Sequence, residues 1–441
     1  MNKKTENKAV SPWQWVPSLY FAQGIPYVVV MSVAVILFKR MGMSNTDIAL
    51  YTSGLNLPWV IKPLWSPLVD LLKTKRWWIV VMQILVGAGL AGIALTIQGP
   101  LAFRYCLAFM WLLAFSSATH DIAADGFYML GLNEKKQAYF VGIRNTFYRF
   151  AVIFGQGILV MFAGWLEQRY AREMPETAAI PQAWSLTFYL LTILFALLFV
   201  YHYLFLPHPR RDTCTLPPQQ ASAGRVFKEF LGTFTSFFQK KHIVRALIFI
   251  LLYRFAEAQL VKITSPFLLD TPATGGLALS TAEVGFIYGT IGVIALTIGG
   301  IVGGIAMARR GLKSCLWTMT IAMNLPNIVY LYLSFARPES IGIISGCVAI
   351  EQFGYGFGFT SLTYFMMLFS NGKHQTAHYA ICTGFMALGL MLPGMISGWI
   401  EESIGYRAFF VWIMLCTIPS FWATHLVRKN LTDNHSDNSS R

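Results

Sequence analysis

Residues 44–53 read SNTDIALYTS, and residues 280–289 read STAEVGFIYG. The two stretches begin 236 residues apart and place small, acidic, β-branched and aromatic residues at the same spacing. In each stretch a serine precedes an acidic residue by three positions, which is the pattern of a capped helix N-terminus. A second pair, AGWLEQRY from residue 163 and SGWIEESIGY from residue 397, begins 234 residues apart. Two matches at nearly equal offsets indicate that the chain consists of two duplicated halves.

Apolar runs bounded by charged residues, proline or glycine predict the same number of helices in each half. The expected helices are 13–38, 47–67, 77–98, 101–129, 138–166, 183–206, 242–268, 281–308, 314–335, 340–369, 375–400 and 406–427. Six helices per half is an even number, so the two halves have parallel orientation. The second match aligns Glu167 with Glu401, each close to the end of the fifth helix of its half. This arrangement resembles the architecture of the major facilitator superfamily.

The composition excludes most alternatives to a membrane protein. Of the 441 residues, 55% are hydrophobic and 12% are charged, whereas soluble domains carry about a quarter charged residues. That balance excludes a soluble enzyme, a disordered regulator and a coiled coil. At about 20 residues per crossing, the apolar residues suffice for about twelve transmembrane helices. We therefore expect an all-α polytopic membrane protein with the major facilitator fold and 12 transmembrane helices in two six-helix repeats.

The net charge predicts the orientation of the chain in the membrane. The 34 basic and 20 acidic residues give a charge of +14, which in a soluble protein would point to nucleic acid. In a polytopic protein, basic residues collect in the cytoplasmic loops. With the N-terminus inside, about 21 Lys and Arg fall in cytoplasmic segments and about 7 in periplasmic ones. We expect a multi-pass protein of the bacterial inner membrane, surrounded by lipid, with both termini cytoplasmic and no nucleic-acid partner.

Changes in composition divide the chain into four parts. Residues 1–206 form the N-terminal six-helix half, and 242–427 form the C-terminal half. Between them, 207–241 is polar and basic, as expected of a solvated cytoplasmic linker. Residues 428–441 form a polar cytoplasmic tail. Nothing in this organisation requires a second copy, and we expect a monomer.

Missing motifs narrow the function further. The chain has no GxxxxGK[ST] phosphate loop, so its energy source is expected to be an ion gradient or the gradient of the substrate itself. It has neither HExxH nor GxSxG, which argues against a polytopic hydrolase. The six cysteines lack CxxC spacing, and His120 beside Asp121 has no second His or Cys at ligand spacing. We expect neither a metal nor a cofactor.

Ionisable residues inside expected helices are costly, and they usually face a cavity or the interior of the bundle. In the first half, Asp121 and Asp125 lie four residues apart and therefore on one face of their helix. Arg149, which shares the helix 138–166 with Arg144, lies at a depth comparable to that of Asp121. An aspartate paired with Arg149 is either a permanent stabilising pair or a carboxylate whose protonation is coupled to transport. Both readings stay open, as does the choice between the two aspartates.

The second half carries a corresponding set of charges. Arg254 and Glu257 are three residues apart and could pair locally. Lys262 lies further toward the periplasm and is a candidate partner or anion contact. Glu351 falls at a nearby depth, so Glu257 and Glu351 are candidate proton sites. The alternative is again a set of structural pairs.

Polar residues within the expected helices could line a route for the substrate. The candidates are Gln23, Tyr27, Asn56, Asn324 and Asn327. Hydrogen bonding between helices explains such residues equally well.

Four segments resemble the AmpG muropeptide permeases and the related peptide, acetyl-coenzyme A and drug transporters. They are SLYFAQGIPY from residue 18, IKPLWSPLVD from 61, FSSATHDIAAD from 115 and LLYRFAEAQ from 251. The third is the most specific, because it contains a serine-alanine stretch followed by two aspartates four residues apart. Arg149 and Glu351 also fall where this family tends to have Arg and Glu.

The resemblance implies a proton-coupled importer of anhydro-muropeptides, acting in peptidoglycan recycling by alternating access. It also implies a gating role in a cytoplasmic loop for Lys62, Trp65, Pro67 and Asp70. Relatives move unrelated solutes, so an oligosaccharide, a siderophore or metallophore, an acyl-coenzyme A or a drug are alternative substrates. The chain departs from the family pattern at Glu257, where Asp is usual, and at Arg254, where Lys is common.

Overall fold

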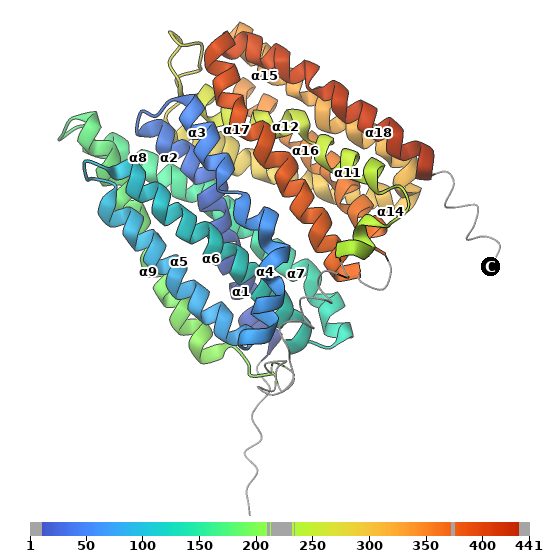
Figure 1. Cartoon of the computed structure of the whole chain (residues 1–441). Helices are drawn as coiled ribbons and strands as arrows, with labels where there is room; N and C mark the ends of the chain where they lie inside the picture. The colour runs from blue at the N-terminus through green and yellow to red at the C-terminus, as the bar shows by residue number, and fades with distance from the viewer. Residues whose placement is uncertain (1–10, 210–211, 213–231, 233, 372–374, 432–441) are drawn as a thin grey trace, which may run out of the picture. The chain divides into compact units, whose positions relative to one another are not determined.

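The computed structural model describes residues 11–209, 212, 232, 234–371 and 375–431, and all regular structure in these ranges is helical (Figure 1). The chain divides into two compact units. Unit 1 comprises Met1–Val28, Trp65–Val152 and Ser185–Ala221, and unit 2 comprises Val29–Leu64, Ile153–Trp184 and Ser222–Arg441. Unit 2 therefore contains the whole second half of the chain together with two segments of the first half.

Unit 1 is built from helices of the first half. Its complete helices are α1 (Pro12–Val28), α5 (Lys75–Thr96), α6 (Ala102–Gly131) and α7 (Glu134–Val152), with the later parts of α4 (Leu57–Leu72) and α9 (Glu176–Phe205). Small residues bring these helices close together, as is typical of membrane proteins. A Cβ atom on Gly92 of α5 would lie 2.4 Å from the ring of Phe109 on α6. One on Gly24 of α1 would lie 2.6 Å from Cβ of Ala151 on α7.

Unit 2 joins segments of the first half to the helices of the second half. The first-half elements are η1 (Val29–Val33), α2 (Ala34–Arg40), α3 (Asn45–Gly54), η2 (Ile153–Leu159) and α8 (Val160–Tyr170). The second-half elements are α11 (Ile243–Leu252), α12 (Phe255–Leu269), α13 (Thr281–Val284), η3 (Gly285–Gly292), α14 (Val293–Asn324), η4 (Leu325–Asn327), α15 (Ile328–Ala336), α16 (Ile341–Ser370), α17 (Gln375–Leu415) and α18 (Thr417–Leu431). Buried apolar residues from α11, α14 and α16, including Phe249, Met319 and Phe365, form a hydrophobic core cluster in it.

Glycines let α14 and α16 pack backbone to backbone. A Cβ atom on Gly356 would lie 2.0 Å from the carbonyl oxygen of Leu296, and one on Gly299 would lie 2.1 Å from that of Phe353. Real Cβ atoms do not approach so closely, so both positions require glycine. This close contact holds in place the helix that carries Glu351.

The helices follow the predicted segments closely. Every predicted segment is largely helical, although turns at 55–56, 253–254 and 416 divide three of them. Both predicted caps are confirmed: the Ser44 hydroxyl accepts from the amide of Asp47, and Ser280 forms a capping box with Glu283. The helices α14 and α17 each run on past a predicted boundary, where Gly311 (φ 71°) and Gly405 (φ 75°) interrupt the helical backbone. A positive φ of this kind favours glycine.

Membrane crossings are numerous, although their exact number stays a prediction. Within the described ranges, seven helical stretches are long and apolar enough to cross a bilayer. Two of them, Thr281–Ala336 with 56 residues and Ala377–Lys429 with 53, have the length of two crossings at about 20 residues each. Most of the expected linker 207–241 and tail 428–441 lies outside the described residues.

Candidate functional site

A charged cluster in unit 1 is built from α1, α6 and α7. Oδ1 of Asp125 lies 3.3 Å from a guanidinium nitrogen of Arg144 and accepts a 3.2 Å hydrogen bond from the hydroxyl of Tyr20. The Arg144 guanidinium also stacks over the rings of Tyr20 at 4.6 Å and Tyr128 at 5.1 Å. The pair that depth in the sequence suggested, Asp121 with Arg149, stays a prediction, and the partner of Asp125 is Arg144. Both side chains are partly exposed.

The remaining predicted charges of unit 1 lie around Tyr148. This tyrosine on α7 interacts electrostatically with Asp121 and Arg149, and its ring centroid lies 6.4 Å from that of Tyr27 on α1. Asp121 and Arg149 are both partly buried. The helices α6 and α7 thus present two carboxylates and two guanidinium groups beside aromatic rings, a combination suited to binding a charged solute.

In unit 2, two buried carboxylates come from α12 and α16. Glu257 and Glu351 are each 2% exposed, and their charges interact. Oε2 of Glu351 accepts hydrogen bonds from the hydroxyl of Tyr330 at 3.2 Å and from Nε2 of Gln352 at 2.9 Å. Oε2 of Glu257 has no hydrogen-bond partner among the described residues. An unsatisfied buried carboxylate oxygen calls for a proton, a water molecule or a ligand.

Arg254 occupies the break between α11 and α12. Its backbone (φ −108°, ψ 22°) departs from the helix, which places Glu257 in the first turn of α12. Its side chain donates a 2.6 Å hydrogen bond to the hydroxyl of Tyr355 and stacks over the rings of Tyr355 at 4.9 Å and Phe359 at 5.0 Å. The hydrogen-bond partner of Arg254 among the described residues is therefore an aromatic residue of α16. Arg254 also interacts electrostatically with Glu257, the local partner that the sequence suggested.

Lys262 is a buried cation on α12. It is 5% exposed, and its ammonium donates a 3.2 Å hydrogen bond to the hydroxyl of Thr52 on α3. The neighbouring Ser53 hydroxyl is buried without a hydrogen-bond partner in the described part of the chain. Gly394 of α17 faces both side chains, since a Cβ atom there would lie 2.6 Å from Oγ of Ser53 and 3.5 Å from Cγ of Lys262. This arrangement offers a positive charge and a free hydroxyl to an anionic group.

Four of the five predicted route residues fall into two groups, and the fifth, Tyr27, lies beside Tyr148. Asn56, in the turn after α3, donates to the carbonyl oxygen of Ser53 at 3.1 Å, and Asn324 donates to that of Thr320 in its own helix at 2.9 Å. Asn327 is 1% exposed, and neither amide atom has a hydrogen-bond partner among the described residues. Oε1 of Gln23 is likewise buried without a described partner. Asn327 and Gln23 therefore retain unused polar atoms, whereas Asn56 and Asn324 form local hydrogen bonds.

The structure describes the side chains of two of the four residues of the predicted cytoplasmic gating motif. Lys62 is half-buried, and the ring of Trp65 lies 5.8 Å from that of Phe115 with an interplanar angle of 41°. The side chains of Pro67 and Asp70 lie outside what the structure describes. In the described ranges, no three His, Cys, Asp or Glu side chains are grouped as metal ligands.

The sequence did not predict a series of buried, hydrogen-bonded polar side chains in unit 1. Gln83 lies within 3.1 Å of Nε2 of His120 and within 3.0 Å of Nδ1 of His202, and Nε2 of His202 lies 3.0 Å from the hydroxyl of Ser18. These residues come from four helices, so no spacing in the sequence connects them. The only signal was the occurrence of two histidines and a glutamine within apolar runs.

Comparisons with known proteins agree with this architecture. A family model described as Major Facilitator Superfamily matches residues 18–377. An Escherichia coli protein named anhydromuropeptide permease is 24% identical over 420 residues, covering 94% of this chain and 79% of the relative. A Rickettsia conorii protein named as an AmpG transporter is 25% identical over 415 residues, covering 92% and 93%.

Solved structures extend the comparison at the level of the fold. The nucleoside transporter NupG superimposes with a TM-score of 0.69 at 15% identity, covering 94% of this chain and 98% of that one. A D-xylose-proton symporter gives a TM-score of 0.69 at 13% identity, covering 94% and 96%.

Proposed function

The chain belongs to the Major Facilitator Superfamily, and on that premise we propose that it imports anhydro-muropeptides by alternating access, driven by protons. It is a transporter of a small molecule and not an enzyme. The observation that carries the coupling proposal is the buried pair of carboxylates, Glu257 and Glu351, in unit 2. The muropeptide is proposed from the likeness to the permease of Escherichia coli.

The carboxylate pair supports coupling to protons on physical grounds. Two negative charges buried close together repel each other and lose their hydration, so binding one proton stabilises the pair. Glu351 is held by Tyr330 and Gln352, whereas Glu257 keeps an unpaired oxygen. Glu257 is therefore the better placed of the two to exchange a proton or to bind a solute.

Each unit contains a cationic site that suits an anionic substrate with groups able to stack on aromatic rings. A muropeptide combines a sugar ring with a peptide that ends in carboxylates. In unit 2, Lys262 with Ser53 offers a site for an anionic group. In unit 1, taken by itself, Arg144 among its tyrosines also offers a site for an anionic group. Sugar rings pack well on aromatic faces, and aromatic residues surround Arg144 and Arg254.

The orientation is proposed from the distribution of charge. We place the protein in the bacterial inner membrane with both termini in the cytoplasm, since that orientation puts most basic residues inside. We propose a monomer of two six-helix halves, 1–206 and 242–427, joined by the linker 207–241. No resident cofactor is needed in this scheme, because the proton gradient supplies the energy.

Uptake of labelled anhydro-muropeptide into energised cells tests the proposal. We expect accumulation that a protonophore abolishes, and no accumulation with Glu257→Gln. Accumulation that is unaffected by the protonophore would contradict proton coupling. The purified protein is also tested for binding to a panel of muropeptides, oligosaccharides, metallophores, acyl-coenzyme A and drugs. If it binds one of the other compounds and no muropeptide, that compound class replaces the muropeptide as the proposed substrate.

A further inference from the structure

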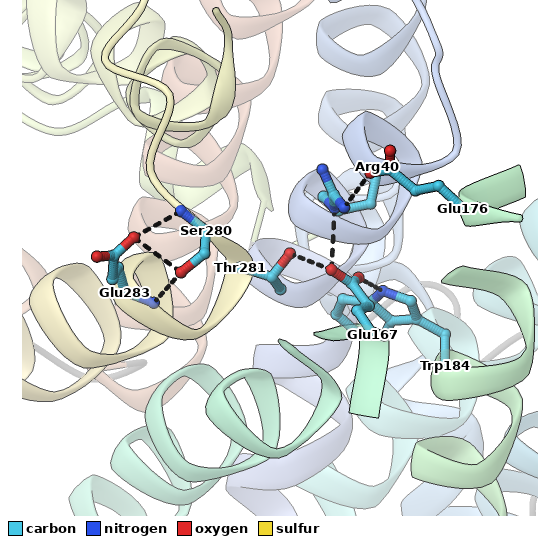
Figure 2. A network of polar contacts seen from close by, with 7 residues as sticks. All are labelled: Arg40, Glu167, Glu176, Trp184, Ser280, Thr281 and Glu283. Atoms are coloured by element: carbon cyan, nitrogen blue, oxygen red, sulfur yellow. Dashed lines mark hydrogen bonds and ion pairs between the residues drawn. The ribbon is translucent and has the colours of Figure 1, made fainter. Parts of the chain in front are cut away.

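Within unit 2, the carboxylate of Glu167 contacts side chains from segments that are distant from it in sequence (Figure 2). Its Oε2 accepts a 2.7 Å hydrogen bond from the hydroxyl of Thr281 and lies 3.1 Å from Nε of Arg40. Its Oε1 accepts a 2.7 Å hydrogen bond from the indole of Trp184. Arg40 also contacts the exposed Glu176 at 2.9 Å. Thr281 belongs to the second half of the chain and the other residues to the first, so Glu167 links the two duplicated halves.

Glu401 makes the reciprocal link. Its Oε2 accepts a 2.6 Å hydrogen bond from Nδ2 of Asn45, which also donates to the hydroxyl of Tyr406 at 2.9 Å. Tyr406 in turn donates to Oδ2 of Asp270 at 2.6 Å. Lys39 lies 2.7 Å from Oδ1 of Asp270 and donates to Oδ1 of Asn45 at 2.8 Å. Here the acid comes from the second half of the chain and its partner Asn45 from the first.

The two links are one arrangement used twice. Thr281 and Asn45 are each the first helical residue after a serine cap, in the two repeated stretches that begin at Ser280 and Ser44. In both links, the acid near the end of the fifth helix of one half binds the start of the second helix of the other half. Duplicated halves related by a two-fold axis produce such crossed contacts in pairs.

Glycines bring the same segments into backbone contact. Gly164 and Gly398 each precede the acid of their link by three residues. A Cβ atom on Gly164 would lie 2.3 Å from the amide nitrogen of Ala282, and one on Gly398 would lie 1.9 Å from the carbonyl oxygen of Asn45. No space for water or solute remains between backbones this close. The crossed links therefore seal this end of unit 2.

We propose that Glu167 and Glu401 are gate residues, whose bonds to Thr281 and Asn45 must break before a solute enters from outside. All four residues adjoin loops that the proposed orientation places on the periplasmic side, and this inference rests on that orientation and on the transporter function. Alternating access requires contacts at one end that form in one state and break in the other. Removing such a contact shifts the population toward the state that lacks it.

The test measures how accessible the sealed region is, and it uses no substrate. Ala163→Cys and Ser397→Cys are reporters at equivalent positions beside Gly164 and Gly398. Ala163 and Ser397 are 0% exposed, and the Ser397 hydroxyl donates to the carbonyl oxygen of Gly394 in its own helix. The rate of modification by a membrane-impermeant maleimide is measured from the outside on intact cells. Cells whose protein lacks the reporter give the background from the native cysteines.

Adding Glu167→Gln or Glu401→Gln is expected to raise the labelling rate at both reporters by about tenfold, which corresponds to a population shift of roughly 1.4 kcal/mol. Glu173→Gln is the matched control, because Glu173 is an exposed acid near Glu167. Should Glu167→Gln fail to fold, Thr281→Val removes the hydroxyl that donates to Glu167 and keeps the shape of the side chain. The labelling rate is then expected to rise by the same factor in Thr281→Val.

Two results would overturn the gate. One is labelling in Glu167→Gln and Glu401→Gln at the rate of the Glu173→Gln control. The other is faster labelling in inverted vesicles alone, which would put these contacts at the cytoplasmic end. If the labelling rate rises as expected but the protein transports no muropeptide, the gate proposal stands and the proposed substrate is wrong. The two proposals can therefore fail separately.

Discussion

The ammonium of Lys262 donates a 3.2 Å hydrogen bond to the hydroxyl of Thr52, and both side chains are buried in unit 2. A buried cation that is held by a neutral hydroxyl keeps most of its charge uncompensated. The proposal that Lys262 binds an anionic group of the solute rests on this arrangement. Three further relationships in the structure lead to predictions of the same kind.

Replacing Lys262 by Met should abolish transport without unfolding the protein. Methionine fills a similar volume and removes the buried charge, so thermal stability should be unchanged or slightly higher. Transport of a carboxylate-bearing solute should fall by at least about tenfold, the equivalent of one lost charged contact of about 1.4 kcal/mol. Flux into proteoliposomes and the melting temperature check both parts. Lys313→Met, at an exposed position of α14, is the control and should change neither.

Replacing Glu351 by Gln should separate accumulation from exchange. The amide cannot carry the exchangeable proton of the Glu257 and Glu351 pair, so proton-driven accumulation should be lost. Exchange of labelled for unlabelled solute needs no net proton movement and should persist. Counterflow and uphill uptake are measured in the same proteoliposomes. Glu339→Gln, an exposed acid before α16, should behave as the parent, and full uphill uptake in Glu351→Gln would exclude Glu351 as a coupling residue.

Arg144, rather than Arg149, should be the residue on which Asp125 depends. Arg144→Met removes the ion pair with Asp125 and the stacking on Tyr20 and Tyr128. If the pair is functional, Arg144→Met and Asp125→Asn should impair transport to a similar degree, and the double variant should be little worse than either one. Combining Asp125→Asn with Arg149→Met should instead give additive losses. Additivity of the Arg144 and Asp125 variants would contradict the observed pairing.

Gly356→Ala should destabilise the protein, while Gly346→Ala on the same helix should not. The added methyl group at 356 would meet the carbonyl oxygen of Leu296, and overpacking of this kind costs typically about 1–3 kcal/mol. At Gly346 no described atom lies within 4 Å of the added carbon, and alanine favours the helix by up to about 1 kcal/mol. Unfolding in detergent compares the two variants. Equal stability would show that α14 and α16 do not pack as described.

The His120 and His202 chain marks a limit of sequence reasoning. Its members Ser18, Gln83, His120 and His202 come from α1, α5, α6 and α9. Periodicity identifies which residues share a face of one helix, but it carries no information about which faces of different helices meet. This set of hydrogen-bonded side chains could therefore not be recognised without knowing how the helices pack.

The choice between Arg144 and Arg149 has a simpler geometric reason. Five residues along a helix correspond to a rotation of about 140°, so these two arginines point to different faces of α7. From the sequence, Arg149 lies at a depth comparable to that of Asp121, and no partner of Arg144 is indicated. Packing against α6 and α1 decides that Arg144 reaches Asp125 and Tyr20.

Hydrophobic periodicity and capping residues are local properties of the chain, so the helical segments and their caps could be predicted from the sequence alone. The duplication into two six-helix halves stays a prediction. The sequence also identified most of the buried charges, since an ionisable residue within an apolar run is conspicuous. The neutral partner of each buried charge follows from tertiary packing: Glu167 with Thr281, Glu401 with Asn45, and Lys262 with Thr52. Each pair joins residues more than a hundred positions apart, so their contact depends on how the helices pack.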